Sequence, residues 1–141
     1  MSIQNRKSKI ENPETVLVDI VHGMLDAIHS GDIEKYRALS VDDLSCYETD
    51  VAPYRIDALD FHLDLMTAMR SRGVYDSLVR FDILTPRVQL YGDSAVITYT
   101  RLMTYTTDSG PVWRAFNETR VFARLEGEWK MVHFHRSQAP V

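Results

Sequence analysis

The stretch AVITYTRLMTYT (residues 95–106), with VWRAFNETRVFARL (residues 112–125) after it, decides the fold class of this chain. β-Branched and aromatic residues dominate both stretches, and residues 78–90 and 128–137 have the same character. Short turn signals separate the four stretches: Tyr91-Gly92-Asp93, Asp108-Ser109-Gly110-Pro111 and Glu126-Gly127. These turns are too short for crossovers, so the sequence predicts four long strands in an antiparallel meander.

The N-terminal half has the apolar spacing of amphipathic helices. Asn12-Pro13 is typical of a helix start, and an apolar stripe at i, i+3, i+4 spacing continues from there to a stop at Ser30-Gly31. Further elements are expected in order: a short helix from Asp32 to about Leu39, a strand at Leu44–Glu48 and a helix at about Asp57–Arg70. Helices followed by a sheet predict an α+β domain, a cone in which the helical stripes cover one face of a curved, mainly antiparallel sheet.

Length and composition indicate one ordinary globular domain. The chain has 141 residues, 45% of them hydrophobic and 26% charged. We expect residues 1–11 to form a mobile tail and residues 12–141 a single domain. From residue 11 onward, 13 basic residues face 20 acidic ones, because three of the 16 basic residues lie in the first ten. An acidic body argues against nucleic-acid binding.

The sequence carries no sign of an oxidising compartment or of a membrane. The single cysteine, Cys46, has no partner for an internal disulfide and more simply fills the core. The polar N-terminus lacks the apolar run of a secretory signal, and no stretch approaches the roughly 20 apolar residues of a membrane span. The sequence therefore predicts a cytoplasmic protein without a membrane partner.

Three arginines inside predicted strands are the most informative candidates for chemistry. Arg101, Arg120 and Arg136 lie in neighbouring strands of the meander, away from the strand ends. An inward-facing arginine needs a carboxylate partner or a bound anion, because an unpaired buried charge is costly. The alternative is that the three side chains face solvent and make weak surface pairs.

The register of the last hairpin decides between these alternatives. If Glu126-Gly127 is a two-residue turn, Arg120 lies opposite His133 and Arg136 falls on the other face. If Leu125-Glu126-Gly127 is a three-residue loop, Arg120 lies opposite Val132 and shares a face with Arg136. In that register Val132, Phe134 and Arg136 form one row with Phe116, Glu118 and Arg120. A single glycine in third place slightly favours the three-residue loop.

Two further side chains accompany the arginines. Glu118 is two residues from Arg120 and therefore on the same face, where it can act as a counter-ion. His62 lies in the apolar stripe of its helix, as either a core histidine or a donor that points into the same cavity. An enzyme of this fold would use a pocket carboxylate as general base, and Glu48 and Glu118 are the candidates.

No cofactor or metal site is predicted. His133 and His135 share a strand face, but no third ligand accompanies them. The chain has no glycine-rich phosphate loop and no nucleophile elbow around Ser137.

Five segments in fixed order resemble the association (hub) domain of calcium/calmodulin-dependent protein kinase II. They are Ala27–Asp32 (AIHSGD), Leu59–His62 (LDFH), Ile83–Pro86 (ILTP), Glu118–Val121 (ETRV) and above all Val132–Ser137 (VHFHRS). The resemblance runs from about residue 14 to residue 140 with almost no gaps. Each segment is weak alone, and the ordered set is specific.

The resemblance implies a nuclear transport factor 2-like fold that self-assembles as a homodimer or a larger ring. It also implies a deep cavity for a small carboxylate, in which Arg101, Arg120 and Arg136 match the cavity arginines and His62 matches a pocket histidine. It thereby favours the three-residue loop. Neither a glycine-rich ATP loop nor an H-R-D motif is present, so the chain is expected not to be a kinase itself.

Two departures from the family pattern leave ring size and ligand open. Pro53-Tyr54 replaces a Gly-Asn pair, and Gln138 replaces a glycine. We expect assembly through the outer sheet face, with Trp129, Met131 and His133 at the interface. The alternative function is a small cofactor-free enzyme of the polyketide-cyclase or ketosteroid-isomerase kind, since one fold hosts many activities.

Overall fold

The structure, a computed structural model, describes residues 12–141, so the tail predicted for residues 1–11 lies outside the described residues. Its elements run in the order α2 (Pro13–Ser30), α3 (Ile33–Ala38), β1 (Ser40–Glu48), β2 (Ile56–Asp57), α4 (Leu59–Ser71), β3 (Leu78–Tyr91), β4 (Ser94–Thr107), β5 (Gly110–Leu125) and β6 (Glu128–Ala139). The α+β class and the four long strands are confirmed. The two-residue strand β2 was not predicted.

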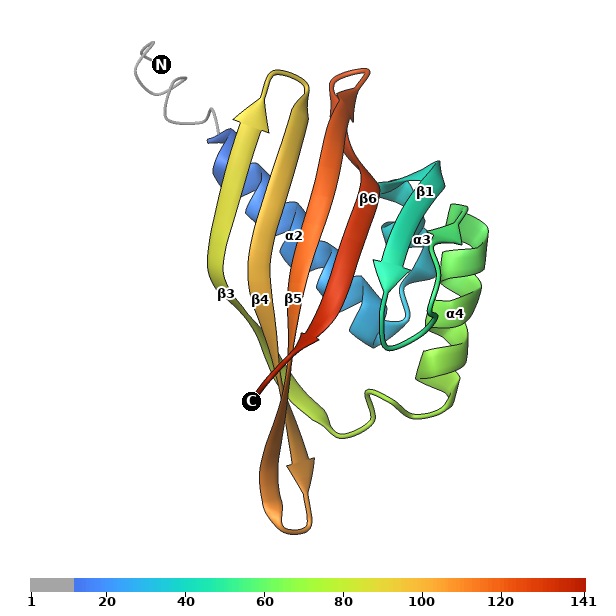
Figure 1. The fold of residues 1–141 in the computed structure, drawn as a ribbon, viewed down its shortest axis with the longest axis vertical. Helices are drawn as coiled ribbons and strands as arrows, with labels where there is room; N and C mark the ends of the chain where they lie inside the picture. The colour runs from blue at the N-terminus through green and yellow to red at the C-terminus, as the bar shows by residue number, and fades with distance from the viewer. Residues whose placement is uncertain (1–11) are drawn as a thin grey trace, which may run out of the picture.

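The six strands form one mixed sheet in the order β2-β1-β6-β5-β4-β3 (Figure 1). Strands β3 to β6 are the predicted antiparallel meander. Strand β1 lies beside β6 and runs parallel to it, which joins the N-terminal half of the chain to the last strand. The β4–β5 hairpin extends beyond the other strands at the lower end of the sheet in Figure 1.

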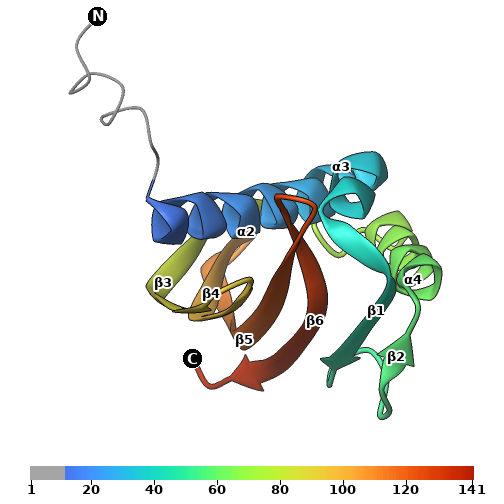
Figure 2. The same ribbon diagram turned by 90° about the horizontal axis from the view of Figure 1, so that it is seen from above.

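The helices cover the concave face of the sheet. Figure 2 shows α2 lying across this inner face, with α3 and α4 toward β1. The α2 stripe is buried at six apolar positions, Leu17, Val21, Met24, Leu25, Ala27 and Ile28. They belong to one core cluster with inward residues of the sheet such as Ile97, Phe122 and Phe134. Each such side chain contributes roughly 1.5 to 3 kcal/mol by leaving water. Among residues 12–141, no helix is long and apolar enough to cross a membrane.

The capping residues predicted from the sequence determine where α2 begins and ends. The Asn12 side chain accepts a hydrogen bond from the Glu14 backbone N–H at 2.8 Å, and Pro13 opens the helix. Gly31 ends it with a φ of 78°, a left-handed conformation that glycine adopts without steric cost. These caps fix where α2 begins and ends relative to the sheet.

The turn between β5 and β6 has two residues. Leu125 pairs with Glu128, and Glu126 and Gly127 both have positive φ values, 53° and 81°. Positive φ at both central residues is the type I′ geometry, whose twist suits a two-residue hairpin. The prediction of a three-residue loop was therefore wrong.

A β-bulge at Val132 changes the faces of the residues that follow it. Phe122 pairs with Met131, but the next residue back, Val121, pairs with His133, so Val132 is the extra residue. The bulge turns Arg136 to the same face as Arg120. The register with a three-residue loop would have placed Arg136 on that face too. Val132 itself does not belong to that inner row.

The bulge also corrects the expected outer-face trio. Met131 is fully buried in the core, and Trp129, two residues before it, packs partly buried against the same core cluster. Both lie on the inner face, whereas His133, beyond the bulge, lies on the outer face beside Ser45. The placement of Trp129 and Met131 on the outer face was wrong, because a bulge reverses the alternation and the sequence does not mark it.

Candidate functional site

A row of charged and phenolic side chains lines the inner face of the sheet. Along β4 every second residue is buried, which turns Tyr99 and Arg101 inward. The register places Tyr99 opposite Glu118, and Glu118 opposite Arg136 on the next strand. Arg120 follows on the same face of β5. Alternation and the Val132 bulge therefore bring the three predicted arginines to one side of the sheet.

Glu118 lies at the centre of this row and is 2% exposed. Its carboxylate lies 3.0 Å from Nη2 of Arg101 and 3.2 Å from Nη2 of Arg120. Tyr99 donates its hydroxyl proton to Glu118 at 2.5 Å and accepts a hydrogen bond from Nε of Arg120 at 2.7 Å. One carboxylate thus compensates two buried guanidinium groups, which are each 1% exposed.

A second carboxylate, Glu48, organises the other half of the network. It contacts Nδ1 of His62 at 2.8 Å and accepts a hydrogen bond from Nη2 of Arg136 at 2.8 Å. Arg136 also donates to both oxygens of Asp50, at 2.9 and 3.1 Å. The other nitrogen of His62, Nε2, lies 3.1 Å from the Tyr36 hydroxyl.

The two halves meet at Tyr36, whose hydroxyl lies 3.5 Å from Nη1 of Arg120. The ring of Phe134 lies between them, 4.8 Å from the Arg120 guanidinium carbon and 5.1 Å from the His62 ring. The buried polar groups therefore form one continuous network rather than separate ion pairs.

Electrostatics keep both buried carboxylates ionised. Burial alone would raise the pKa of Glu118, but the charges of Arg101 and Arg120 outweigh it and hold the pKa below its ordinary value. Burial would likewise raise the pKa of Glu48, and the hydrogen bond from His62 with the Arg136 charge lowers it to about 2. Burial raises the pKa of the Tyr99 phenol, which therefore stays a proton donor. Neither carboxylate has the raised pKa of a general base.

Arg101 and Arg136 line a very narrow cleft, with a cavity volume of about 10 Å³, between the sheet and the segment after α4, together with Asp50, Tyr75, Arg114 and Phe116. Arg120, His62 and Glu118 do not line this cleft. The expectation that three arginines and His62 point into one deep cavity is thus corrected: the network absorbs Arg120, His62 and Glu118. Two donor nitrogens of Arg101, Nε and Nη1, are buried without a hydrogen-bond partner in the described part of the chain.

Cys46, Glu48 and His62 place one potential metal-ligand atom each within 4.8 Å of one another. Glu48 and His62 already contact each other at 2.8 Å, and Glu48 also pairs with Arg136. Burial raises the pKa of the Cys46 thiol to about 12, so the thiolate that a nucleophile requires is not available. This cluster is part of the packed network rather than a metal centre.

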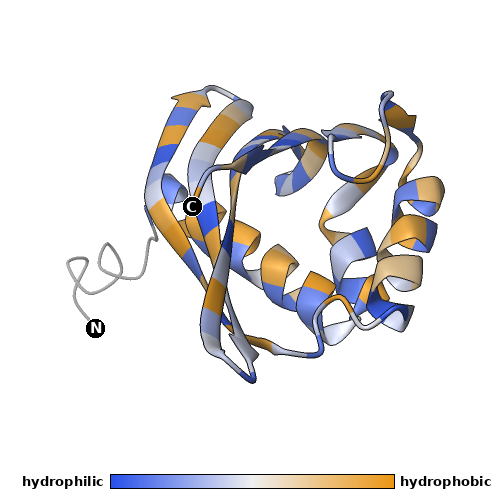
Figure 3. Ribbon diagram, turned by 60° about the horizontal axis from the view of Figure 1, so that its bottom comes forward, coloured by the Kyte–Doolittle hydropathy of each residue, from blue (hydrophilic) through white to orange (hydrophobic). Residues whose placement is uncertain are grey.

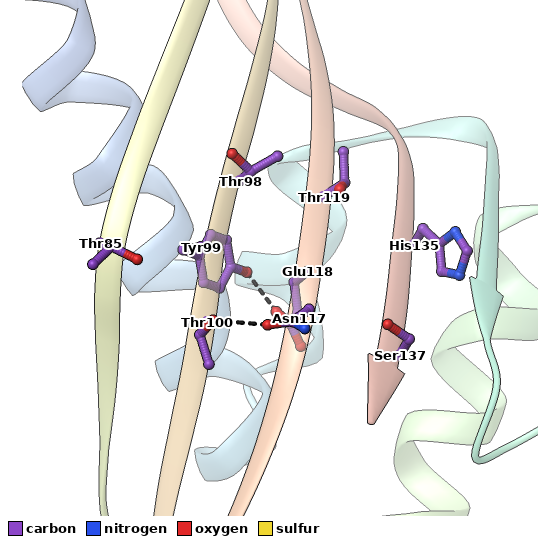
Figure 4. Close-up of a pocket in the computed structure, with 9 residues that line it drawn as sticks. All are labelled: Thr85, Thr98, Tyr99, Thr100, Asn117, Glu118, Thr119, His135 and Ser137. Atoms are coloured by element: carbon purple, nitrogen blue, oxygen red, sulfur yellow. Dashed lines mark hydrogen bonds between the residues drawn. The ribbon is translucent and has the colours of Figure 1, made fainter. Parts of the chain in front are cut away.

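The outer face of the sheet carries a shallow polar hollow of about 350 Å³ (Figure 4). It is lined by Thr85, Thr98, Thr100, Asn117, Thr119, His135 and Ser137. Tyr99 and Glu118 also border it, although their buried side chains turn to the inner face. In Figure 4 the Tyr99 hydroxyl points to Glu118, and Thr100 donates a hydrogen bond to Asn117 at 2.8 Å.

An aromatic cluster on β1 and β6 occupies the same face as this hollow. The Tyr47 ring, 39% exposed, lies 5.5 Å from the His135 ring and 6.2 Å from the His133 ring. His133 contacts the Ser45 hydroxyl at 2.8 Å.

Sequence reasoning missed five participants: Tyr36, Asp50, Tyr99 and Arg114 in the network and cleft, and His29 beside them. The sequence could have indicated Tyr99 and Asp50. Tyr99 lies two residues from Arg101 on the same strand, and Asp50 lies two residues after Glu48, just beyond the end of β1. Tyr36 and His29 come from helices whose approach to the sheet no local pattern shows.

The family profile of the calcium/calmodulin-dependent protein kinase II association domain matches residues 14–140. The chain belongs to this family. The rabbit (Oryctolagus cuniculus) calcium/calmodulin-dependent protein kinase type II subunit delta is 33% identical over 126 residues, which cover 88% of this chain and 23% of that protein. The chain therefore spans about a quarter of the length of this curated relative. The expected family is confirmed.

Solved structures agree on the fold. The S. rosetta CaMKII hub superposes with a TM-score of 0.80 and 29% identity, covering 92% of this chain and 99% of that one. A putative ketosteroid isomerase from Parabacteroides distasonis shares the fold alone, with a TM-score of 0.73 and 22% identity over 92% of this chain and 89% of that one. NTF2-like proteins are among the matches, so the predicted fold class is confirmed.

We predict that Glu118→Gln destabilises the domain by about 3 to 5 kcal/mol, because it leaves Arg101 and Arg120 buried without their shared counter-charge. Urea unfolding at pH 7 measures the loss. Glu128→Gln makes the same change at an exposed pair with Lys130 and should leave stability within about 0.5 kcal/mol. Equal effects of the two variants would contradict the central role of Glu118.

His29 lies near the end of α2, with its ring 4.9 Å from the rings of both Tyr75 and Phe81. Its Nε2 is buried without a partner in the described residues. Burial, helped by the charge of Arg101, lowers the pKa of His29 from 6.5 to about 4. Between these two values the unfolded chain binds a proton at His29 that the folded domain does not bind, so stability falls as the pH falls.

We predict that His29→Gln reduces the stability lost between pH 7 and pH 4.5 by about 2 kcal/mol relative to the unsubstituted chain. Urea unfolding at both pH values gives the difference. His22→Gln, which removes an exposed histidine from the same helix, is the control for the substitution itself. The same pH dependence in the His29 variant as in the unsubstituted chain would refute the assignment.

Proposed function

We propose that the chain is a self-associating hub-like domain that carries an anion-binding cleft. Membership of the association-domain family supports self-association. The structural match to the S. rosetta CaMKII hub covers 99% of the hub chain, so the similarity in fold extends over that entire domain. The proposed partners are further copies of this chain and a small carboxylate or related anion.

The outer face of the sheet is the proposed surface for association. It carries a partly exposed tyrosine, two histidines and a row of hydroxyl groups around the shallow hollow, and no helix within residues 12–141 lies over it (Figure 2). Aromatic side chains with a polar rim are typical of protein interfaces. A two-fold axis through this face would bring Tyr47 and His133 of two copies together. Of the trio expected at the interface, only His133 is retained in this proposal.

Arg101 carries the proposal of an anion site. Its guanidinium is 1% exposed and lines the cleft, and two of its donors lack a partner within residues 12–141. Buried N–H groups without acceptors cost about 1 to 3 kcal/mol, which a bound anion would recover. A carboxylate suits a guanidinium because charge-assisted hydrogen bonds are the stronger ones.

The alternative function, a small enzyme with a carboxylate base, is less well supported. Glu48 and Glu118 are both bound by arginine, and the pKa of each lies below its ordinary value. Catalysis by a general base at neutral pH needs a pKa shifted the other way, and a free lone pair toward the substrate.

Tyr47→Glu is expected to dissociate the assembly, because it places a charge at the centre of the proposed contact. Light scattering should report the mass of a single chain. Tyr91→Glu introduces the same change at a more exposed tyrosine at the end of β3 and should leave the assembly mass unchanged. An unchanged mass for Tyr47→Glu would exclude this part of the outer face from the interface.

Arg101→Lys tests the anion cleft. It keeps the positive charge beside Glu118 but removes the unpartnered Nε–H and Nη1–H donors. We expect the dissociation constant for butyrate, measured by isothermal titration calorimetry, to rise about tenfold while the assembly mass stays the same. Arg124→Lys, at an exposed pair with Asp93, is the control and should bind like the unsubstituted chain. Equal affinities of the two variants would place the site elsewhere.

A further inference from the structure

Two of the five histidines lie close together on the outer face of the sheet. His133 and His135 are two residues apart on β6, so strand alternation directs both rings to this face. His133 is half-buried and His135 is exposed, and the His135 ring borders the shallow hollow (Figure 4). The Tyr47 ring on β1 adjoins both of them. The surface proposed for association thus carries two imidazoles, the side-chain group that gains a proton closest to neutral pH.

The strands on either side of β6 offer these histidines no negative charge. On β5, His133 lies opposite Val121 and His135 lies opposite Thr119, which are both uncharged. On β1, the neutral Ser45 hydroxyl lies 2.8 Å from Nδ1 of His133. The histidine ion pairs within residues 12–141 lie in α2 and in the buried network, so neither of the outer histidines has a carboxylate partner there.

The nearby charged groups do not compensate an imidazolium either. Arg55, just before β2, pairs with Asp57 at 2.7 Å, and Asp43, two residues before Ser45 on β1, is exposed. Burial lowers the pKa of His133 below its ordinary value, and the charges of His135 and Arg55 act in the same direction. His133 is therefore neutral at pH 7. Acidification adds a positive charge to a surface that already disfavours one.

We propose that protonation of His133 and His135 dissociates the assembly, so that self-association of this chain is controlled by pH. The inference rests on the proposed association through the outer face. A two-fold axis through this face sets the histidines of two copies near each other, where two imidazolium groups repel and lose hydration. In the separate chain the same groups are open to water. Protons therefore bind the separate chains more tightly than the assembly, and by linkage acid favours dissociation.

The mass of the unsubstituted chain at two pH values tests this inference. Each proton that association must release raises the dissociation constant by up to about tenfold per pH unit. Two copies contribute at least two such protons through His133, so we expect the dissociation constant to rise at least about tenfold between pH 7.5 and pH 5.5. Sedimentation of a dilution series at constant ionic strength measures it, and far-UV circular dichroism confirms that the chain is folded at both pH values.

The double variant His133→Gln/His135→Gln removes the two titrating groups. The amide of glutamine can still hydrogen-bond the Ser45 hydroxyl but does not gain a proton. We expect its dissociation constant to be the same at both pH values within about twofold. His22→Gln is the matched control, since it removes an exposed histidine from α2, on the other side of the sheet, and should keep the full pH response.

A second pair of variants separates charge from packing. His133→Lys places a permanent positive charge on the outer face, and His133→Met places an unbranched, uncharged side chain of similar length there. The lysine variant should have the mass of a single chain already at pH 7.5. The methionine variant should assemble at both pH values.

The outcomes separate this inference from the function on which it rests. A single-chain mass of the unsubstituted protein at pH 7.5 would overturn self-association itself. Equal dissociation constants of the unsubstituted chain at pH 7.5 and pH 5.5 would overturn the pH control and leave association intact. A pH response that persists in the double variant, or assembly of His133→Lys as tight as that of His133→Met, would overturn the role of these two histidines.

Discussion

The buried carboxylate of Glu118 is the constraint on which the sheet depends. It is nearly inaccessible to water and compensates Arg101 and Arg120 at the same time, while Tyr99 donates a third contact. Buried charges are tolerated only when they are paired and hydrogen-bonded. A slip of one residue between β4 and β5 would turn Tyr99 and Arg101 outward and set Thr98 or Thr100 opposite Glu118, so the network penalises that slip.

The same constraint explains the bulge in β6. A regular ladder continued from the two-residue Glu126-Gly127 turn would direct Arg136 to solvent, away from Glu48 and Asp50. The extra residue at Val132 restores the inward direction of Arg136 and keeps His133 and His135 on the outer face. The tight turn and the inward arginine are thus compatible only because the strand contains this irregularity.

Sequence reasoning reached the fold class and the four long strands, because alternation and turn signals are local. The same signals left the direction of the three arginines open, and the family resemblance favoured the inward side. It failed where packing between distant segments decides. The Val132 bulge has no sequence mark, so Trp129 and Met131 were assigned to the wrong face. Arg120 and His62 looked like pocket residues, and only the contacts of Tyr36 and Glu48, which come from other elements, show that the network absorbs them.

Strand alternation also links the two proposed surfaces. On β6, Arg136 lines the cleft and its neighbour His135 faces the outer side. On β1, Glu48 is buried in the inner network and its neighbour Tyr47 is exposed on the outer side. Tyr47 pairs with His135 and Glu48 with Arg136, so each pair of inner residues adjoins a pair of outer ones. A shift of the β6 backbone that accompanies a change of partner at Arg136 must therefore also move His135. The sheet is the shared wall of the cleft and of the proposed association surface, and a closely packed sheet transmits such shifts because its core cannot absorb them.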